Sequence, residues 1–314
     1  MKKIVFFLLL AWSVSAQNTS DRKIYLDSTF AETTEDRHHF YRIVTDYHKK
    51  QLTYHMVDYY KSGNIYSQCY STSNNKQSPV GQLTKYYENG NKKSISSYED
   101  GALTGAYTTW HQNGNPEMEG EYIPIESEGI KRSVKESMLK INQFWDSNNQ
   151  IKVKDGHGYC VIVHDKGCDE GSVKNGVKDS LWAGSENFKY TYVEKYKDGK
   201  LVSGTSVDQD GQYFYTSIEE QAEYPGGIIA FPKYVQKNFR IPEVRGLNGK
   251  LVISFVIEKD GSVGDIRIVK SMGEAADNEA TRVVSESLAW KPGKVRGRKM
   301  RILYSIPINI VTPD

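Results

Sequence analysis

The chain has 314 residues, with 41 lysines and arginines against 39 aspartates and glutamates, and a formal net charge of +2. This near balance argues against a nucleic-acid-binding protein, which would carry a strongly basic face. The length suggests about two domains, at ~100–200 residues each. Three cysteines are an odd number, so they cannot all pair within one molecule. A bridge between Cys160 and Cys168 across a hairpin is left open.

Residues 1–16 have the features of a secretory signal peptide. Lys2 and Lys3 form a positive start, residues 4–12 form a short apolar run, and a small-residue cleavage site ends at Ala16. The apolar run is about half of the roughly 20 residues that span a bilayer, and an uncleaved membrane anchor is the alternative. We expect cleavage before Gln17 and a mature protein in the periplasm, without a membrane span.

Residues 17–50 form a lead-in that is polar and acidic at first. Residues 40–44, Phe-Tyr-Arg-Ile-Val, are rich in β-branched and aromatic side chains, which predicts an entry strand.

Residues 51–217 carry a repeated pattern rich in tyrosine, serine, asparagine and glycine. Residues 81–91 and 105–115 align position by position, 24 residues apart, and residues 59–64 give a third copy. Each copy places Asn-Gly or Ser-Gly beside alternating aromatic positions, which is typical of a β-hairpin. A lone hairpin is marginal in water, so we expect the copies to stack into an elongated antiparallel array.

The stacked hairpins should share a core built from three aromatic residues, namely Tyr59, Tyr86 and Trp110. Three degenerate copies follow at residues 155–159, 173–182 and 196–201. These units resemble MORN-like repeats, in which a glycine is expected at the position of Ser180.

Residues 130–145 fit two patterns. Ile130, Val134 and Met138 recur at helical spacing, whereas Leu139, Ile141 and Trp145 alternate as in a strand. We favour a strand over residues 137–145, because its neighbours are hairpins.

Residues 218–314 predict an α+β domain, with a boundary near Ser217. Residues 251–257 and 263–269 alternate as two strands around an Asp-Gly turn, and residues 301–311 alternate as a third.

Two helices should pack on this three-stranded antiparallel sheet. One lies between Gly227 and Phe239, with Pro232 tolerated only in its first turn. The second has Asp277 placed to cap its N-terminus, and its apolar residues Ala280, Val283, Val284 and Leu288 recur at helical spacing. The predicted fold class is therefore mainly β plus α+β.

This last segment also carries a series of motifs in a fixed order. They are Tyr224-Pro225-Gly226-Gly227, Asp260-Gly261 and Trp290-Lys291-Pro292-Gly293, followed by Ile306-Pro307-Ile308. The series resembles the C-terminal domain of the TonB family, whose members engage outer-membrane transporters from the periplasm. The resemblance implies protein binding, transmembrane transport and energy transduction.

The resemblance also implies a mode of binding, in which a transporter segment adds a strand to the edge of the domain's sheet. The third strand would offer that edge. Its candidate partner-binding residues are Arg301, Leu303, Ser305, Ile306 and Ile308. The chain departs from the family by lacking a proline-rich spacer and an uncleaved N-terminal anchor, which puts direct energy coupling in doubt.

No catalytic or metal-binding pattern stands out. The seven histidines form no helical pair at i, i+4, and Cys-x-x-Cys and Gly-x-Ser-x-Gly motifs are absent from the sequence. We therefore expect no catalytic residue, no metal ligand, no cofactor and no enzymatic activity.

One basic cluster comprises Lys291, Lys294, Arg296, Arg298, Lys299 and Arg301. It could attract anionic polymers or lipids, but solvated charges on a loop are the simpler interpretation.

Two function hypotheses follow. The first is a TonB-like protein that binds an outer-membrane transporter or another envelope protein. The alternative is a structural or interaction protein of the cell envelope that uses the repeat array as its binding surface.

Overall fold

The structure is a computed structural model that describes residues 20–125, 136–164, 166–186, 189–227, 229–244 and 246–312. The predicted signal peptide lies outside these residues. The chain divides into two compact units. The first runs up to Cys160 and includes Val173–Val177, and the second comprises Val161–Ser172 and everything from Lys178 onward.

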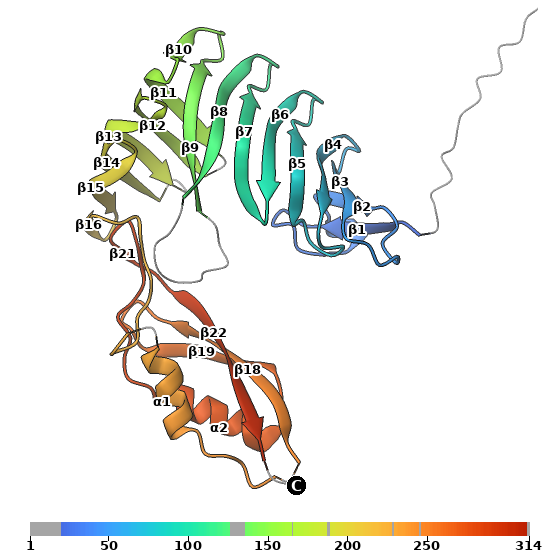
Figure 1. Cartoon of the computed structure of the whole chain (residues 1–314), viewed down its shortest axis with the longest axis vertical. Coiled ribbons are helices and arrows are strands. Elements are labelled where there is room, and N and C mark those ends of the chain that lie inside the picture. The colour runs from blue at the N-terminus through green and yellow to red at the C-terminus, as the bar shows by residue number, and fades with distance from the viewer. Residues whose placement is uncertain are drawn as a thin grey trace, which may run out of the picture. The chain divides into compact units, whose positions relative to one another are not determined.

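Within the described ranges, sixteen strands pair with their neighbours in chain order, as Figure 1 shows. They are β1 (Arg22–Leu26), β2 (Phe40–Val44), β3 (Tyr54–Tyr60), β4 (Ile65–Ser71), β5 (Pro79–Tyr86), β6 (Lys92–Glu99), β7 (Ala102–Trp110), β8 (Pro116–Ile125), β9 (Glu136–Trp145), β10 (Ile151–Lys154), β11 (His157–His164), β12 (Gly167–Lys174), β13 (Val177–Glu186), β14 (Tyr190–Lys197), β15 (Lys200–Asp208) and β16 (Gly211–Tyr215). The pairs β3–β4, β5–β6, β7–β8 and β14–β15 are antiparallel, as the hairpin pattern predicts.

The turns explain why the repeats contain Asn-Gly. In the turn between β5 and β6, the Tyr87 N–H donates to the Asn91 carbonyl at 2.8 Å, and Gly90 has a φ of 88°. Gly63 and Gly114 occupy the same position of their turns, with φ values of 93° and 89°. Glycine adopts this left-handed conformation at little steric cost, so each repeat needs it to close its hairpin.

Asparagine side chains join each turn to the next. The Nδ2 atom of Asn64 donates to the carbonyl oxygen of Glu88 at 2.8 Å, and that of Asn89 donates to Gln112 at 2.8 Å. Asn113 donates to the Ser147 carbonyl at 3.0 Å. This ladder satisfies turn carbonyls that a single hairpin would leave to water, so the asparagines help specify the stacking.

The core of the N-terminal hairpins differs from the prediction. Tyr59, Tyr86 and Trp110 are only half-buried, because they lie at strand ends beside the turns. The buried cluster instead has one tyrosine among mostly aliphatic and sulfur-containing side chains, and it comprises Ile24, Leu26, Val44, Tyr54, Met56, Cys69 and Leu83.

The array contains one strand that the sequence predicts and one that it does not. The strand predicted over residues 137–145 is confirmed as β9. The lead-in contains β1, which the sequence reading missed because its five residues include two cations, Arg22 and Lys23. No disulfide bridge joins Cys160 to Cys168 in the described structure.

The C-terminal part has the predicted α+β architecture. A sheet in the order β19 (Val263–Lys270), β18 (Asn248–Ile257) and β22 (Ile302–Val311) packs against α1 (Ala230–Asn238) and α2 (Glu274–Ser285). Figure 1 shows both helices on one face of this sheet. A smaller sheet joins β17 (Glu219–Glu220), β20 (Lys294–Val295) and β21 (Arg298–Lys299).

The start of α2 differs from the prediction. The helix begins at Glu274, so Asp277 lies inside its first turn and does not precede it. The Asp277 carboxylate instead accepts the Met272 N–H at 3.1 Å and the Ser271 hydroxyl at 2.6 Å. It therefore still satisfies donors at the helix entrance, where a negative charge is favourable.

Neither described α-helix has the length and apolar character needed to cross a bilayer. Over the same described ranges, no cluster of histidine, cysteine and acidic side chains is arranged to hold a metal ion.

Candidate functional site

The strand β22 lies at an edge of the C-terminal sheet. Among the described strands it pairs only with β18, along its whole length from Ile302 opposite Ile257 to Val311 opposite Asn248. This register contains no bulge. One side of β22 is thus a continuous row of backbone groups without a strand partner in the described structure.

A hydrogen bond just beyond β22 shows which of its backbone groups face β18. The Thr312 N–H donates to the Leu247 carbonyl at 2.8 Å, and these two residues continue the register of the strand pair. Antiparallel partners alternate between pairs that exchange hydrogen bonds and pairs that do not. Even-numbered residues of β22 therefore bond to β18, and odd-numbered residues direct their N–H and C=O groups to the free edge.

Pro307 agrees with this assignment. It has an odd number, so its nitrogen faces the free edge and its lack of an N–H leaves the ladder with β18 intact. Proline within a sheet is confined to such positions.

Side chains of β22 alternate in the same way. Ile306, Ile308 and Ile310 are buried in the core beneath the helices. Leu303, Ser305 and Asn309 point to the opposite, exposed face, and Leu303 is 71% exposed. The exposed leucine is a ready apolar contact for anything that binds along this edge.

The residues of the ordered motifs converge on one aromatic cluster. The Tyr224 and Trp290 rings are 5.2 Å apart between centroids, and both contact Phe231. The Glu223 and Lys291 backbones exchange hydrogen bonds of 3.0 and 2.8 Å. The first and third motifs are therefore joined directly, although the sequence separates them by more than sixty residues.

Close backbone approach explains two of the motif glycines. Gly261 has a φ of 90°, and a Cβ at this position would lie 2.0 Å from the Trp290 carbonyl oxygen. A Cβ on Gly293 would lie 2.8 Å from a side-chain carbon of Ile302. No side chain fits at Gly261, so the Asp260-Gly261 turn can dock on Trp290 and close the domain.

Comparisons with known proteins find relatives of the C-terminal part of the chain. Residues 242–310 match the family model described as the Gram-negative bacterial TonB protein C-terminal. This segment is a TonB C-terminal domain.

Two proteins named TonB, from Helicobacter pylori strains J99 / ATCC 700824 and ATCC 700392 / 26695, are each 35% identical over 98 residues. The alignments cover 28% of this chain and 35% and 34% of those proteins. The chain thus spans about a third of the length of the curated relatives it matches.

The residues predicted to bind a partner occupy different environments in the TonB C-terminal domain. Leu303 and Ser305 are exposed on β22, whereas the Ile306 and Ile308 side chains belong to the core. Arg301 precedes β22 and forms ion pairs of 2.7 Å with Glu258 and with Asp265. Its guanidinium group therefore connects the start of β22 to the β18–β19 hairpin.

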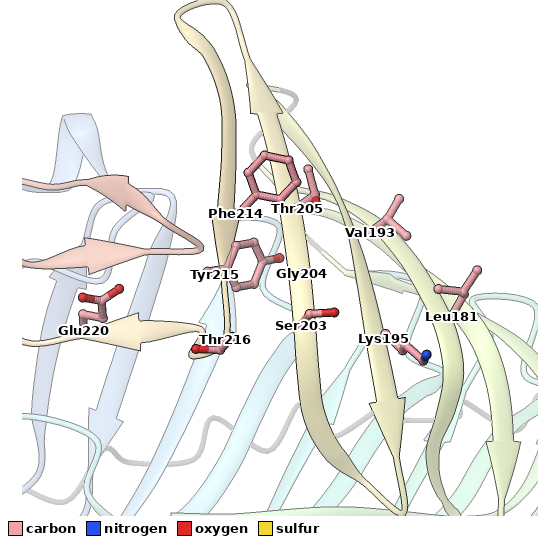
Figure 2. Close-up of a pocket in the computed structure, with 10 residues that line it drawn as sticks. All are labelled: Leu181, Val193, Lys195, Ser203, Gly204, Thr205, Phe214, Tyr215, Thr216 and Glu220. Atoms are coloured by element: carbon pink, nitrogen blue, oxygen red, sulfur yellow. The ribbon is translucent and has the colours of Figure 1, made fainter.

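A second surface feature lies outside the TonB C-terminal domain. The exposed face of β13 to β16 contains a hollow of about 610 Å³, shown in Figure 2. Phe214 and Thr205 stand side by side there on neighbouring strands, and Val193 and Leu181 follow on the strands beyond. Phe214 is 77% exposed, which is unusual for so large an apolar side chain.

The sequence reading missed a buried ion pair between Glu194 and Arg296. The basic cluster predicts solvated charges on a loop, but the Arg296 side chain is only 12% exposed and contacts the fully buried Glu194 at 2.8 Å. A signal was present, because Tyr190, Tyr192 and Tyr196 share one face of a strand with Glu194. A carboxylate on a buried aromatic face requires a cation or hydrogen-bond donors.

Proposed function

We propose that this protein is a non-catalytic, TonB-like envelope protein that binds a partner by β-strand addition along the free edge of β22. The observation that carries the proposal is the outward direction of the odd-numbered N–H and C=O groups of that strand. The partner would be an outer-membrane TonB-dependent transporter or another envelope protein, and the location would be the periplasm. The family match over residues 242–310 supports a TonB-type role in transmembrane transport.

Strand addition requires main-chain hydrogen bonds and side-chain contacts, and the free edge of β22 offers groups for both. Main-chain groups at Leu303, Ser305 and Asn309 would supply hydrogen bonds, and exposed side chains such as Leu303 would supply selectivity. Pro307 interrupts the row of donors once, since it has no N–H. An added peptide would therefore bond most continuously on the Arg301 side of Pro307, where Leu303 and Ser305 both offer donors.

Ser305→Pro tests this edge, because Ser305 directs its N–H away from β18. The substitution removes one edge donor and leaves the ladder with β18 in place, as Pro307 already does. We expect the proline variant to lose binding of an extended peptide. The probes would be fluorescent peptides from the N-terminal segments of the producing organism's outer-membrane transporters, and the measurement would be fluorescence anisotropy on the full chain.

Ser305→Ala is the matched control. It removes the hydroxyl that donates to the Ile253 carbonyl at 3.3 Å but keeps the backbone N–H, so it should retain binding. Circular dichroism must show that both variants are folded. Equal peptide binding by the alanine variant and a folded proline variant would exclude this stretch of the edge.

The hollow on β13 to β16 favours the alternative that the repeat array is the binding surface. Phe214→Ser removes its most exposed aromatic side chain and should not disturb the fold. If partner capture in intact-cell crosslinking survives Ser305→Pro but is lost in Phe214→Ser, the array is the binding surface. The opposite result supports the β22 edge.

A further inference from the structure

One face of β14 combines three buried tyrosines with a buried carboxylate. Tyr190, Tyr192, Glu194 and Tyr196 alternate with exposed residues along the strand, and Glu194 has no exposed surface. Placing a carboxylate in such surroundings is costly unless charge and hydrogen bonds compensate it. The contacts of Glu194 therefore show which groups compensate its buried charge.

Two tyrosine hydroxyls satisfy part of the Glu194 carboxylate. Tyr196 donates to Oε2 at 2.9 Å, and Tyr215 on β16 donates to Oε1 at 2.8 Å. Burial and the negative charge of Glu194 together raise the pKa of Tyr196. The two hydroxyls thus stay protonated as donors, but they leave the negative charge itself without a counter-charge.

Arg296 supplies that charge from the turn between β20 and β21. Its Nε donates to Glu194 Oε1 at 2.8 Å, and its Nη1 donates to Glu186 Oε2 at 3.0 Å. The guanidinium carbon lies 3.7 Å from the centroid of the Tyr192 ring. The cation is therefore held by two carboxylates and by one aromatic face.

The backbone around Arg296 is anchored to the same region. The Arg296 N–H donates to the Ile218 carbonyl at 2.6 Å, and its carbonyl accepts the Ser206 hydroxyl at 2.8 Å. Arg296 itself has a φ of 49°, a conformation that costs a non-glycine residue free energy. The strained turn and the side-chain contacts together place the guanidinium group in its site.

We propose that Glu194, Glu186 and Tyr192 form a guanidinium-binding site on the array, which Arg296 fills in cis to latch the β20–β21 hairpin of the C-terminal part to β14. This site is separate from the β22 edge. Its test therefore does not depend on the proposed function.

The geometry selects a guanidinium over an ammonium group. Two carboxylates are engaged by different nitrogens of one planar fork, while the flat face of the group covers an aromatic ring. Lysine offers a compact point charge and cannot satisfy these three contacts from one position. A second arginine, Arg298, also combines an aromatic ring with a carboxylate. Its guanidinium group lies 3.2 Å from the Tyr190 ring centroid and 3.6 Å from Asp208.

Chemical rescue of Arg296→Ala tests the site in the full chain. The truncated variant leaves the carboxylates without their cation, so its melting temperature should fall by several degrees. Low-millimolar ethylguanidinium should recover much of that loss, whereas ethylammonium should not. Wild-type protein, whose site is filled, should gain nothing from either compound.

Arg301→Ala is the matched control, because Arg301 also pairs with two carboxylates but does so within the C-terminal domain. Ethylguanidinium should not rescue it. Equal rescue of both variants, or no rescue of a folded Arg296→Ala protein, would overturn the proposal.

Arg296→Lys covers the case in which the alanine variant fails to fold. It keeps a positive charge beside Glu194 but loses the fork and the flat face. We expect a lower melting temperature and faster hydrogen exchange at the amide of residue 296 than in the wild type. A lysine variant that matches the wild type in both measurements would show that any cation suffices, which contradicts a guanidinium site.

Discussion

Cys69 is a buried thiol beside a buried ion pair. It is 4% exposed, and burial followed by the charge of Asp58 raises its pKa to about 11. Asp58 is in turn held by Arg42, whose Nε donates to its carboxylate at 2.6 Å. The thiol is therefore almost entirely protonated near neutral pH, and the reactive thiolate is scarce.

We expect selective alkylation of the three thiols. At about pH 8, near the ordinary pKa of a cysteine, iodoacetamide should modify the half-buried Cys168 first. Cys69 and Cys160, which are both buried, should react only after denaturation. Peptide mass spectrometry of native and urea-treated samples gives the measurement. Native protection of Cys168 together with Cys160 would indicate a bridge between them, which the structure does not have.

At the scale of one hairpin, Ser180 occupies a backbone position that favours glycine. It has a φ of 60°, and the equivalent residues of the earlier repeats, Gly81 and Gly105, have φ values of 69° and 64°. The left-handed conformation costs a non-glycine residue about 1–2 kcal/mol. The glycine expected here from the MORN-like pattern thus has a conformational reason.

Ser180→Gly should therefore stabilise the protein. Relief of the left-handed conformation is partly offset by glycine's larger entropy in the unfolded chain, roughly 0.5–1 kcal/mol. We expect a net gain of about 0.5–1 kcal/mol in the free energy of unfolding, measured by urea denaturation.

Gly105→Ser is the converse control. Among the described residues other than its chain neighbours, none has an atom within 4 Å of the position that a Cβ would take at Gly105, so any loss of stability reports the backbone conformation and not a clash. A stabilising serine at residue 105 would contradict the argument.

Strand β22 shows how far a single element can be read from sequence. Alternation predicts a strand, and Pro307 indicates an edge position. The pattern also predicts two faces, but it does not say which face the helices cover. That choice buries Ile306 and Ile308 and leaves Leu303 exposed, because the helices pack only on one side.

At the scale of the whole molecule, buried and half-buried tyrosines link the stability of the fold to pH. Burial is the first cause that raises the pKa of Tyr107, Tyr192, Tyr196 and Tyr215 above the ordinary value of 10.0. The folded state therefore holds these protons more tightly than the unfolded chain. Their contribution to stability is complete below about pH 10 and is lost as the pH rises further.

We expect the urea midpoint to fall between about pH 10 and pH 11 while remaining nearly constant from pH 8 to pH 9. Tyr107→Phe removes one of these titrating groups and should make the decline shallower. Full-chain unfolding followed by circular dichroism measures both. A midpoint that stays constant through pH 11 would contradict the burial of these hydroxyls.

The boundary near Ser217 remains a proposal, since the compact second unit joins residues on both sides of it. The contacts of Arg296 with Glu186 and Glu194 account for part of that joining.

The sequence by itself determined the hairpin repeats, the strand and helix order of the α+β domain and its TonB-like motifs. These features depend on local rules, namely periodicity, Asn-Gly turns and positions that only glycine fits. Tertiary structure alone decided which N–H groups of β22 face outward, because the hydrogen-bonding phase of a strand depends on its neighbour. It also decided the partner of Glu194, which lies 102 positions away along the chain. A charge on a buried face signals that a partner must exist, but only the folded chain brings Arg296 to it.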